Sequence, residues 1–338
     1  MKNVRPIRVV HYGLGATGRA VAQMVGRTPG LELVGGIDRD PALLQRDLGE
    51  VLGLEQPLGI SVKDDPVAVL EAARPDIAIV ATTSLLKDTY SQIQTCLRAR
   101  TNVISTCEEL VYPYARHRQL AKDLDELACY SGVSVLGVGV NPGFVMDLLP
   151  LILTGPSSCV SRISVTRVTN ATLRRASLYQ RIGAGLTTEQ FRDHITDPCN
   201  RHIGMLESLH MMADTIGWKV ERIDERIEPI LSEEWVREGH FAIAPGQIAG
   251  IRQVAVGTVE GREAVRLDWQ TVVGSQETYD AIVIDGTPPI NLLVKGGLHG
   301  DQAASALVLH AIRPVVAARC GLLTVTEMPP IRYTAPSA

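Results

Sequence analysis

The feature that most constrains this chain is a glycine-rich turn close to its N-terminus. The apolar run at residues 7–12 predicts a buried strand, and helical periodicity follows the turn as far as Met24. Between the two lie Gly13, Leu14, Gly15, Ala16, Thr17 and Gly18. This order of elements is typical of dinucleotide-binding units: the first glycine permits a tight turn, the second admits a pyrophosphate and the third lets the helix pack on the strand. Residues 13–18 are therefore predicted to contact a dinucleotide.

The next predicted strand ends in an acid where such a unit holds a ribose. Residues 31–38 read LELVGGID, and the acid is Asp38. Its carboxylate suits the ribose hydroxyls of NAD. Arg39 beside it can pair with the 2′-phosphate of NADP or simply lie on the surface, and both interpretations stay open. The predicted cofactor is accordingly NADP or NAD; the alternative is a turn without a ligand and a solvated acid.

Length and composition exclude several other classes of protein. A chain of 338 residues is long enough for two domains, and a formal charge of −4 gives no basic field for nucleic acid or an anionic membrane. No apolar run reaches the roughly 18 residues that a membrane-spanning helix needs. The first apolar run enters the glycine turn, so we interpret it as a strand rather than a signal peptide. The six cysteines are scattered, which favours reduced thiols and a cytoplasmic protein.

The hydrophobic pattern divides the chain into two domains. Residues 1–141 alternate short apolar strands with helices, one of them predicted at 41–54, and this favours an α/β, Rossmann-type, doubly wound parallel sheet. Residues 142–300 carry long segments with period-two alternation, typical of an α+β substrate domain with a largely antiparallel sheet. Residues 301–338 return to helical periodicity, with Asp301 as the predicted N-cap, and are expected to pack back on the first domain.

Polar residues directly follow three of the predicted parallel strands. Thr82 and Thr83 follow DIAIVA, Glu108 follows NVIST and Cys107, and Asn141-Pro142 follows VLGVGV. Ligands of open α/β sheets lie outside the carboxyl ends of the strands. We therefore expect these residues near the nicotinamide, with Thr82 and Thr83 among the cofactor contacts.

Two adjacent acids, Glu108 and Glu109, stand at one of these strand ends. A carboxyl group beside an apolar cofactor ring can donate and accept protons. Acids are also favoured in the first turn of a helix by the helix dipole. Because adjacent residues do not face the same side, we expect one glutamate in each role, and we assign the cleft to Glu108.

Cysteine and histidine offer weaker alternatives. Cys107 can be read as the nucleophile of a semialdehyde dehydrogenase or as a small buried residue, and no obvious histidine partner supports the first interpretation. Cys199, His202, Glu207 and His210 lie close in sequence but lack metal-ligand spacing, so no metal site is predicted. His299 can equally contact substrate or cap a turn.

Outside the strand ends, substrate contacts can come from the stretch ATLRRASLYQRIGAGLT. Arg174 or Arg175 can hold a substrate carboxylate in a bidentate contact, and Tyr179 and Gln180 are polar groups that can point into a pocket. The alternative interpretation of this stretch is a solvated basic loop.

Several motifs resemble those of the 2,4-diaminopentanoate dehydrogenases and the native amine dehydrogenases. They are ISTCEELVYP, GVNPGFVMDLLPLIL, QRIGAGLT, HIGMLESL, GGLHGD and GLLTVTEMPP. The resemblance covers almost the whole chain. These families share a nucleotide-binding domain related to dihydrodipicolinate reductase, whose own HHxxKxDAPSG segment is missing here.

The resemblance implies an NAD(P)-dependent amine dehydrogenase, which interconverts a primary amine with its ketone or aldehyde plus ammonia. It also implies that the strand-end glutamate, Glu108, is catalytic, and that the protein is a homodimer joined through its antiparallel sheet. The residues expected around the substrate are Asn141, Pro142, Phe144, Leu178 and Gln180. Arg174 and Arg175 permit a diaminopentanoate substrate, whereas Phe144 and Leu178 permit a plain amine. A diaminopentanoate dehydrogenase proper, a cysteine-dependent semialdehyde dehydrogenase and a non-catalytic NAD(P) sensor are the competing hypotheses.

Overall fold

The computed structural model describes residues 5–173, 177–238 and 241–335. The chain divides into two compact units, the first formed by Met1–Gly143 together with Gly300–Ala338 and the second by Phe144–His299. The chain therefore crosses between units at two places, once after Gly143 and once after His299. Each unit has its own sheet.

The first unit is built on a seven-stranded parallel sheet with the order β15-β6-β5-β4-β1-β2-β3. Its strands are β1 (Ile7–Tyr12), β2 (Leu31–Ile37), β3 (Val62–Lys63), β4 (Ile77–Val80), β5 (Asn102–Ser105), β6 (Ser134–Gly137) and β15 (Gly321–Leu323). The central strands β4 and β6 are buried at every position, as their continuous apolar runs predict. The strand order reverses between β1 and β4, which makes this point the topological switch of the sheet.

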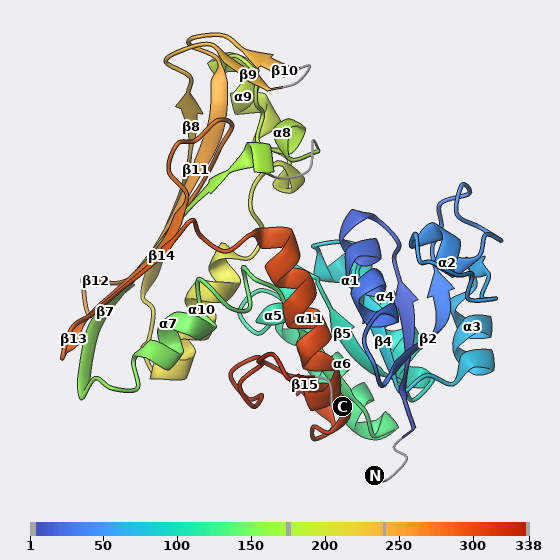
Figure 1. The fold of residues 1–338 in the computed structure, drawn as a ribbon. Coiled ribbons are helices and arrows are strands. Elements are labelled where there is room, and N and C mark those ends of the chain that lie inside the picture. The colour runs from blue at the N-terminus through green and yellow to red at the C-terminus, as the bar shows by residue number, and fades with distance from the viewer. Residues whose placement is uncertain (1–4, 174–176, 239–240, 336–338) are drawn as a thin grey trace. The chain divides into compact units, whose positions relative to one another are not determined.

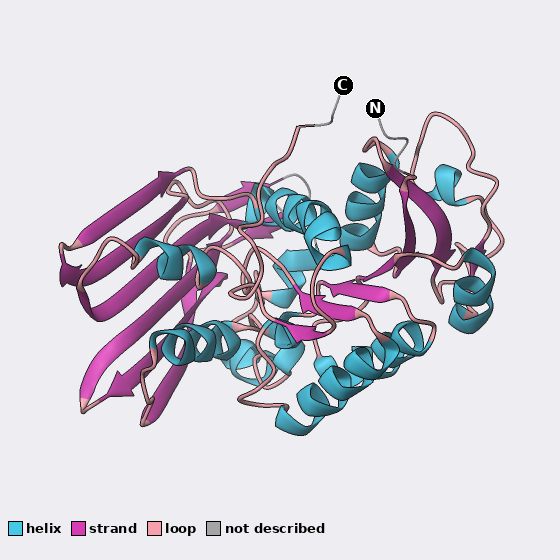
Figure 2. Ribbon diagram, turned by 90° about the horizontal axis from the view of Figure 1, so that it is seen from below, coloured by secondary structure: helices cyan, strands magenta, loops and turns pink. Residues whose placement is uncertain are grey.

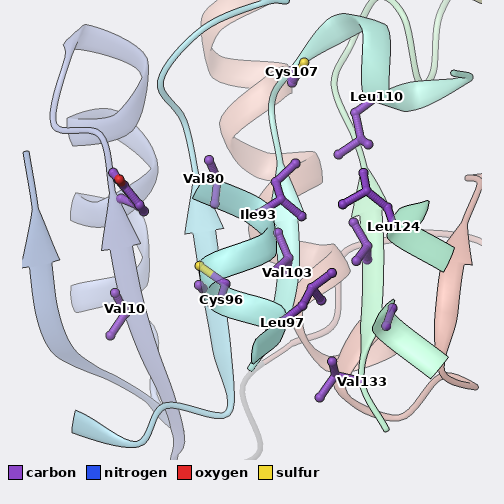
Figure 3. Packing of buried hydrophobic residues seen from close by; sticks show 14 of the residues in the cluster. Val10, Val80, Ile93, Cys96, Leu97, Val103, Cys107, Leu110, Leu124 and Val133 are labelled. Carbon is purple, nitrogen blue, oxygen red and sulfur yellow. The ribbon is translucent and has the colours of Figure 1, made fainter. Parts of the chain in front are cut away.

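Helices cover both faces of this sheet. They are α1 (Ala16–Gly26), α2 (Leu48–Val51), α3 (Pro66–Ala73), α4 (Leu86–Arg98), α5 (Glu108–Val111), α6 (Arg118–Ser131) and α11 (Gly300–Val316). α1 and α11 pack against each other on one face, and α3, α4 and α6 cover the other (Figure 1). On the second face, Val80 and Val103 from neighbouring strands lie beside Ile93 and Leu97 of α4 (Figure 3).

The helix predicted at residues 41–54 is mostly absent, because the Asp47 side chain accepts hydrogen bonds from the backbone around it. Only Leu48–Val51 is helical. The Asp47 carboxylate accepts hydrogen bonds from the N–H groups of Gly49 and Leu58, at 2.8 and 3.0 Å, and from two further backbone N–H groups. These bonds lower the pKa of Asp47, although burial opposes them most strongly. A left-handed Gln45, with φ of 61°, keeps the preceding residues out of a helix.

The second unit is built on a six-stranded sheet with the order β14-β13-β7-β12-β11-β8. Its strands are β7 (Cys159–Asn170), β8 (Arg222–Leu231), β11 (Ile248–Val259), β12 (Arg262–Val272), β13 (Tyr279–Thr287) and β14 (Ile290–Lys295). They lie side by side in Figure 2, and every neighbouring pair is antiparallel except β7 and β12, which are parallel. The predicted fold class, a doubly wound parallel sheet plus a largely antiparallel sheet, is confirmed.

Shorter elements complete the second unit. They are α7 (Leu148–Leu153), α8 (Ser177–Arg181), α9 (Thr188–His194), α10 (Met205–Ile216), the small hairpin of β9 (Val236–Glu238) and β10 (Phe241–Ile243), and two 3₁₀ turns (Ala171–Leu173 and Pro198–Asn200). α10 packs on β11 and β12 and against α7. Asp147 is the N-cap of α7, and its buried carboxylate also accepts a 2.7 Å hydrogen bond from the Ser208 hydroxyl on α10. This contact fixes α7 to α10.

A buried ion pair anchors the end of the second unit. Arg167 on β7 and Asp280 on β13 lie opposite each other in the sheet, and their charged groups are 2.6 Å apart. Arg167 donates a second bond to the carbonyl of Leu298, and Asp280 accepts the Leu298 N–H at 2.7 Å. Both backbone groups of Leu298 are thereby held immediately before the crossing at His299.

α11 differs from the prediction at its first residue. The helix begins at Gly300, so Asp301 lies inside its first turn and is not the N-cap. An acid at this position still favours the helix, since the first turn carries the positive end of the dipole.

Candidate cofactor and catalytic site

The glycine turn after β1 has the geometry that its spacing predicts. Gly13 has φ of +97°, and a Cβ there would lie 2.5 Å from the carbonyl oxygen of Ala81, at the end of β4. A Cβ at Gly18 would lie only 1.9 Å from the Gly13 carbonyl oxygen. These two glycines therefore let α1 and β4 approach the turn, because any larger residue would push the backbones apart.

Gly15 is different, because a Cβ on it would meet nothing within 4 Å. It is the N-cap of α1, and no side chain caps this helix end. Free backbone N–H groups at a helix N-terminus favour an anion. Gly15 is not needed for packing, and the open space above it fits a pyrophosphate. Residues 13–18 can therefore hold NAD(P) at the switch point of the sheet.

Asp38 lies at the end of β2, next to this turn. One of its carboxylate oxygens accepts the N–H of Leu14 at 2.5 Å, and the other accepts the N–H of Asp40 at 2.8 Å. These bonds orient the carboxylate, and each oxygen keeps a second lone pair for a hydroxyl donor. Arg39 is exposed, and its charge lowers the pKa of Tyr12, which burial raises by more. Both cofactor interpretations of Arg39 remain available on this geometry.

The segments after β4 and β5 are joined to each other. The Thr82 hydroxyl donates to Gln92 on α4 at 2.6 Å, and the Thr83 hydroxyl accepts the Leu85 N–H. Ser84 accepts two hydrogen bonds from the β5 side, one from the Cys107 thiol and one from the Glu109 N–H. The structure therefore brings together the strand-end residues that follow β4 and β5.

The two adjacent glutamates have different surroundings. Glu109 is buried, and its carboxylate accepts the N–H of Leu86 at 2.8 Å and pairs with His117 at 2.9 Å and Arg116 at 3.4 Å. This carboxylate holds the start of α4. Glu108 is only half-buried, in the first turn of α5. One of the two therefore has a structural role, and nothing in the sequence alone identified its partners on residues 116 and 117.

Cys107 is buried and unsuited to nucleophilic attack. Burial raises the pKa of its thiol to about 12, and the thiol donates a hydrogen bond to the Ser84 carbonyl. A cysteine nucleophile needs an accessible thiolate near neutral pH. The geometry therefore fits the interpretation of Cys107 as a small buried residue.

The Asn141-Pro142-Gly143 segment follows β6 on the same edge of the sheet. The Asn141–Pro142 peptide bond is cis, and Gly143 has φ of +116°. A Cβ at Gly143 would lie 2.7 Å from the backbone nitrogen of Gly139, so glycine is needed for this close return of the chain. Pro142 is buried and Asn141 is half-buried.

The remaining predicted substrate residues belong to the second unit. Phe144 and Leu178 are half-buried and Gln180 is exposed. Leu178 packs against an apolar cluster under α8, and Tyr179 lies with its ring 5.2 Å from that of Phe241. Arg174 and Arg175 lie outside the described residues.

The described residues contain no group of three or more histidine, cysteine or acidic side chains placed to hold a metal ion. Among the same residues, no helix combines the length and the apolar character needed to cross a bilayer.

Comparisons with known proteins cover the whole chain. Residues 144–336 match the 2,4-diaminopentanoate dehydrogenase C-terminal domain, and residues 7–107 match the N-terminus of dihydrodipicolinate reductase. The chain is 30% identical to the 2,4-diaminopentanoate dehydrogenase of Acetoanaerobium sticklandii, over 96% of this chain and 93% of that protein. It is 25% identical to the amine dehydrogenase of Streptomyces virginiae, over 96% of each. The solved structure of amine dehydrogenase from Mycobacterium smegmatis has a TM-score of 0.86 and 26% identity, covering 97% of both chains.

A parallel sheet with a glycine turn at its switch point is the architecture of a dinucleotide-binding domain. The chain belongs to the 2,4-diaminopentanoate dehydrogenase family, since that match spans more than half of its length. Its enzyme class is NAD(P)-dependent amine dehydrogenase. The predicted family, enzyme class and cofactor type are confirmed.

Proposed function

We propose that Glu108 is the catalytic acid–base group in the interconversion of a primary amine with its ketone or aldehyde and ammonia. The observation that supports this most is the contrast between the two adjacent carboxylates. Glu109 is buried among Leu86, Arg116 and His117, whereas Glu108 is half-buried at the carboxyl end of β5. Ligands of such sheets bind at this edge, which also carries the glycine turn.

The reaction needs proton transfers that one carboxyl group can perform. As ammonia adds to the carbonyl carbon, the Glu108 carboxylate takes a proton from nitrogen and passes it to the oxygen, which gives the carbinolamine. Glu108 then takes a second proton from solvent and donates it to that hydroxyl, which leaves as water and gives the iminium cation. The carboxylate that remains stabilises the iminium cation. Bound NAD(P)H supplies the hydride that reduces the iminium carbon to the amine. Residues 13–18, Asp38, Thr82 and Thr83 hold and orient that cofactor in this proposal.

The substrate in this proposal is a primary amine, and the residues that the sequence predicts around it are Asn141, Pro142, Phe144, Leu178 and Gln180. The name of one relative specifies a diaminopentanoate, and the names of two others specify only an amine. Apolar packing around Leu178 and Tyr179 supports a plain amine. The discriminating assay compares 2-pentanone plus ammonia with 2,4-diaminopentanoate. Faster turnover of 2,4-diaminopentanoate would instead assign the chain to the diaminopentanoate dehydrogenases proper.

Assembly, location and cofactor preference belong to the same proposal. Resemblance to the family supports a homodimer formed through the unit Phe144–His299, which sedimentation tests. Six free cysteines support a reducing compartment such as the cytoplasm. Exposed Arg39 beside Asp38 supports use of NADP as well as NAD, and the ratio of kcat/KM for the two cofactors measures the preference.

The central test pairs Glu108→Gln with Cys107→Ala. We expect Glu108→Gln to lower kcat for reductive amination by about 10²–10⁴, the usual contribution of general acid–base catalysis, while the Kd for NADPH and NADH stays unchanged. Cys107→Ala, one residue away, should keep its activity. Full activity of Glu108→Gln would overturn the assignment of the catalytic group. An inactive Cys107→Ala that still binds cofactor would favour the semialdehyde dehydrogenase hypothesis, and NAD(P)H binding without turnover on any carbonyl would favour a sensor.

A further inference from the structure

A cavity lies in the first unit, away from the glycine turn. Its volume is about 480 Å³, and it is lined by the end of α1, the second half of α11 and the tail at residues 329–334. Gly15 caps the N-terminal end of α1, whereas Arg27 in the cavity caps its C-terminal end. At 1.5 Å per residue, the eleven residues of α1 separate the two sites by about 16 Å.

Three arginines line this cavity, and none of its lining residues is acidic. They are Arg27, Arg313 and Arg332. In the part of the chain that the structure describes, no carboxylate forms an ion pair with any of the three. A hollow with three uncompensated guanidinium groups attracts anions, and guanidinium pairs with phosphate through two parallel hydrogen bonds.

The arginines are gathered from three separate segments. Arg27 and Arg313 stand at the C-terminal ends of helices, where the helix dipole favours a cation. A helix dipole does not explain the position of Arg332, because the tail around it has no regular secondary structure. Arg313 is held in place by a 3.3 Å hydrogen bond to the Pro29 carbonyl, and Gly30 leaves room for it, since a Cβ there would lie 2.7 Å from Nη2.

Rings and prolines form the rest of the wall. Tyr333 meets His310 edge to face with their centroids 5.8 Å apart, and 71% of Tyr333 is exposed. Burial lowers the pKa of His310, which keeps its ring neutral near pH 7. The largely exposed ring of Tyr333 offers a flat apolar face next to the cationic groups, which suits a planar base better than a simple anion.

We infer that this cavity binds a nucleoside phosphate, with the phosphate on the three arginines and the base against the ring of Tyr333. This site is separate from the cofactor turn and does not depend on the proposed catalytic role of Glu108. Its ligand is distinct from the NAD(P) that the enzyme already holds. The nucleotide is recognised by two features together, its charge and its ring.

The test is a calorimetric titration of ADP into the enzyme saturated with NADPH. We expect one ADP per chain, binding at least tenfold more tightly than adenosine or pyrophosphate, with the fluorescence of bound NADPH unchanged. Arg332→Ala should weaken ADP about tenfold, as loss of one charge-assisted contact implies. The matched control, Arg98→Ala, removes another exposed arginine, at the end of α4, and should leave ADP binding unchanged.

Four results would overturn the inference. One is no ADP binding to the NADPH-saturated enzyme. A second is displacement of NADPH by ADP, which would put ADP in the cofactor turn. Another is equal loss of affinity in Arg332→Ala and Arg98→Ala, which would indicate general charge attraction. Pyrophosphate binding as tightly as ADP would exclude the nucleotide and leave only an anion site.

Discussion

The two sheets of this protein differ in the charged groups that they bury. The parallel sheet of the first unit is filled with aliphatic side chains, among them Val10, Val80 and Val103 (Figure 3). The sheet of the second unit buries charged and polar groups on its strands, including the Arg167–Asp280 pair. Apolar packing is tolerant of small changes, whereas a buried charge is stable only while its partner remains.

The two units also differ in the substitutions that should destabilise them. In the first unit the tightest approaches are between backbones, at Gly13 and Gly18. The second unit has a close backbone approach as well, at Gly250, but there buried charged side chains also hold the backbone, as at Leu298. Added volume should therefore damage the turn at Gly13 and Gly18, whereas removed charge should damage the second unit near Leu298.

The largest effect is expected for Asp280→Ala. It removes the carboxylate that faces the buried Arg167 charge and accepts the Leu298 N–H, so unfolding free energy should fall by about 3–5 kcal/mol. The matched control is Asp285→Ala, which removes the acid of an exposed Arg162–Asp285 pair on the same two strands and should cost less than about 1 kcal/mol. Urea unfolding measures both. Equal losses would contradict the special role of the buried pair.

A smaller change in stability is expected from Gly18→Ala. The added methyl meets the Gly13 carbonyl oxygen, so unfolding free energy should fall by about 1–3 kcal/mol and the turn should lose its shape for the cofactor. Gly15→Ala separates the two effects, because its methyl has open space and occupies only the position expected for the pyrophosphate.

Thermal unfolding and NADPH titration distinguish these glycine variants. Gly15→Ala should keep the wild-type Tm and bind NADPH at least about tenfold more weakly. Gly18→Ala should have both a lower Tm and a lower affinity for NADPH. Wild-type NADPH affinity in Gly15→Ala would contradict the assignment of this turn to the cofactor.

Sequence pattern alone was sufficient where a local rule decides the structure. The glycine spacing at 13–18 and the apolar run at 77–80 predicted a turn and a strand because neither depends on distant partners. The helix expected at 41–54 was wrong because its apolar spacing carries no sign of the backbone bonds that Asp47 accepts. Local patterns are silent on contacts of this kind.

Contacts between distant residues were out of reach for the same reason. Arg167 and Asp280 are 113 positions apart, and only the register of β7 against β13 puts them opposite each other. Pairing of Glu109 with His117 was likewise hidden, since the two acids 108 and 109 look equivalent in sequence. The catalytic assignment to Glu108 stays a prediction. The structure adds that the carboxylate of its neighbour, Glu109, binds Leu86, Arg116 and His117.

A buried histidine in the parallel sheet of the first unit gives an effect that depends on pH. His11 on β1 is fully buried, and among the described residues neither ring nitrogen has a hydrogen-bond partner of ordinary geometry. Burial lowers its pKa to about 4, and the Gly13 backbone and the Asp38 charge offset this only in part. Its ring is therefore neutral in the folded protein at pH values where the unfolded chain, with a histidine pKa of about 6.5, already binds a proton.

This difference makes stability fall as the pH is lowered from about 6.5 to about 4, because the unfolded state binds more protons in that window. Between pH 7 and pH 5 the loss from His11 should be about 2 kcal/mol. His11→Leu should remove that part of the pH dependence, as urea unfolding at the two pH values measures. The half-buried His210 of the second unit has a pKa lowered by the same cause, and His210→Leu should remove less. An unchanged pH dependence in His11→Leu would mean that β1 opens enough to protonate the ring before the unit unfolds.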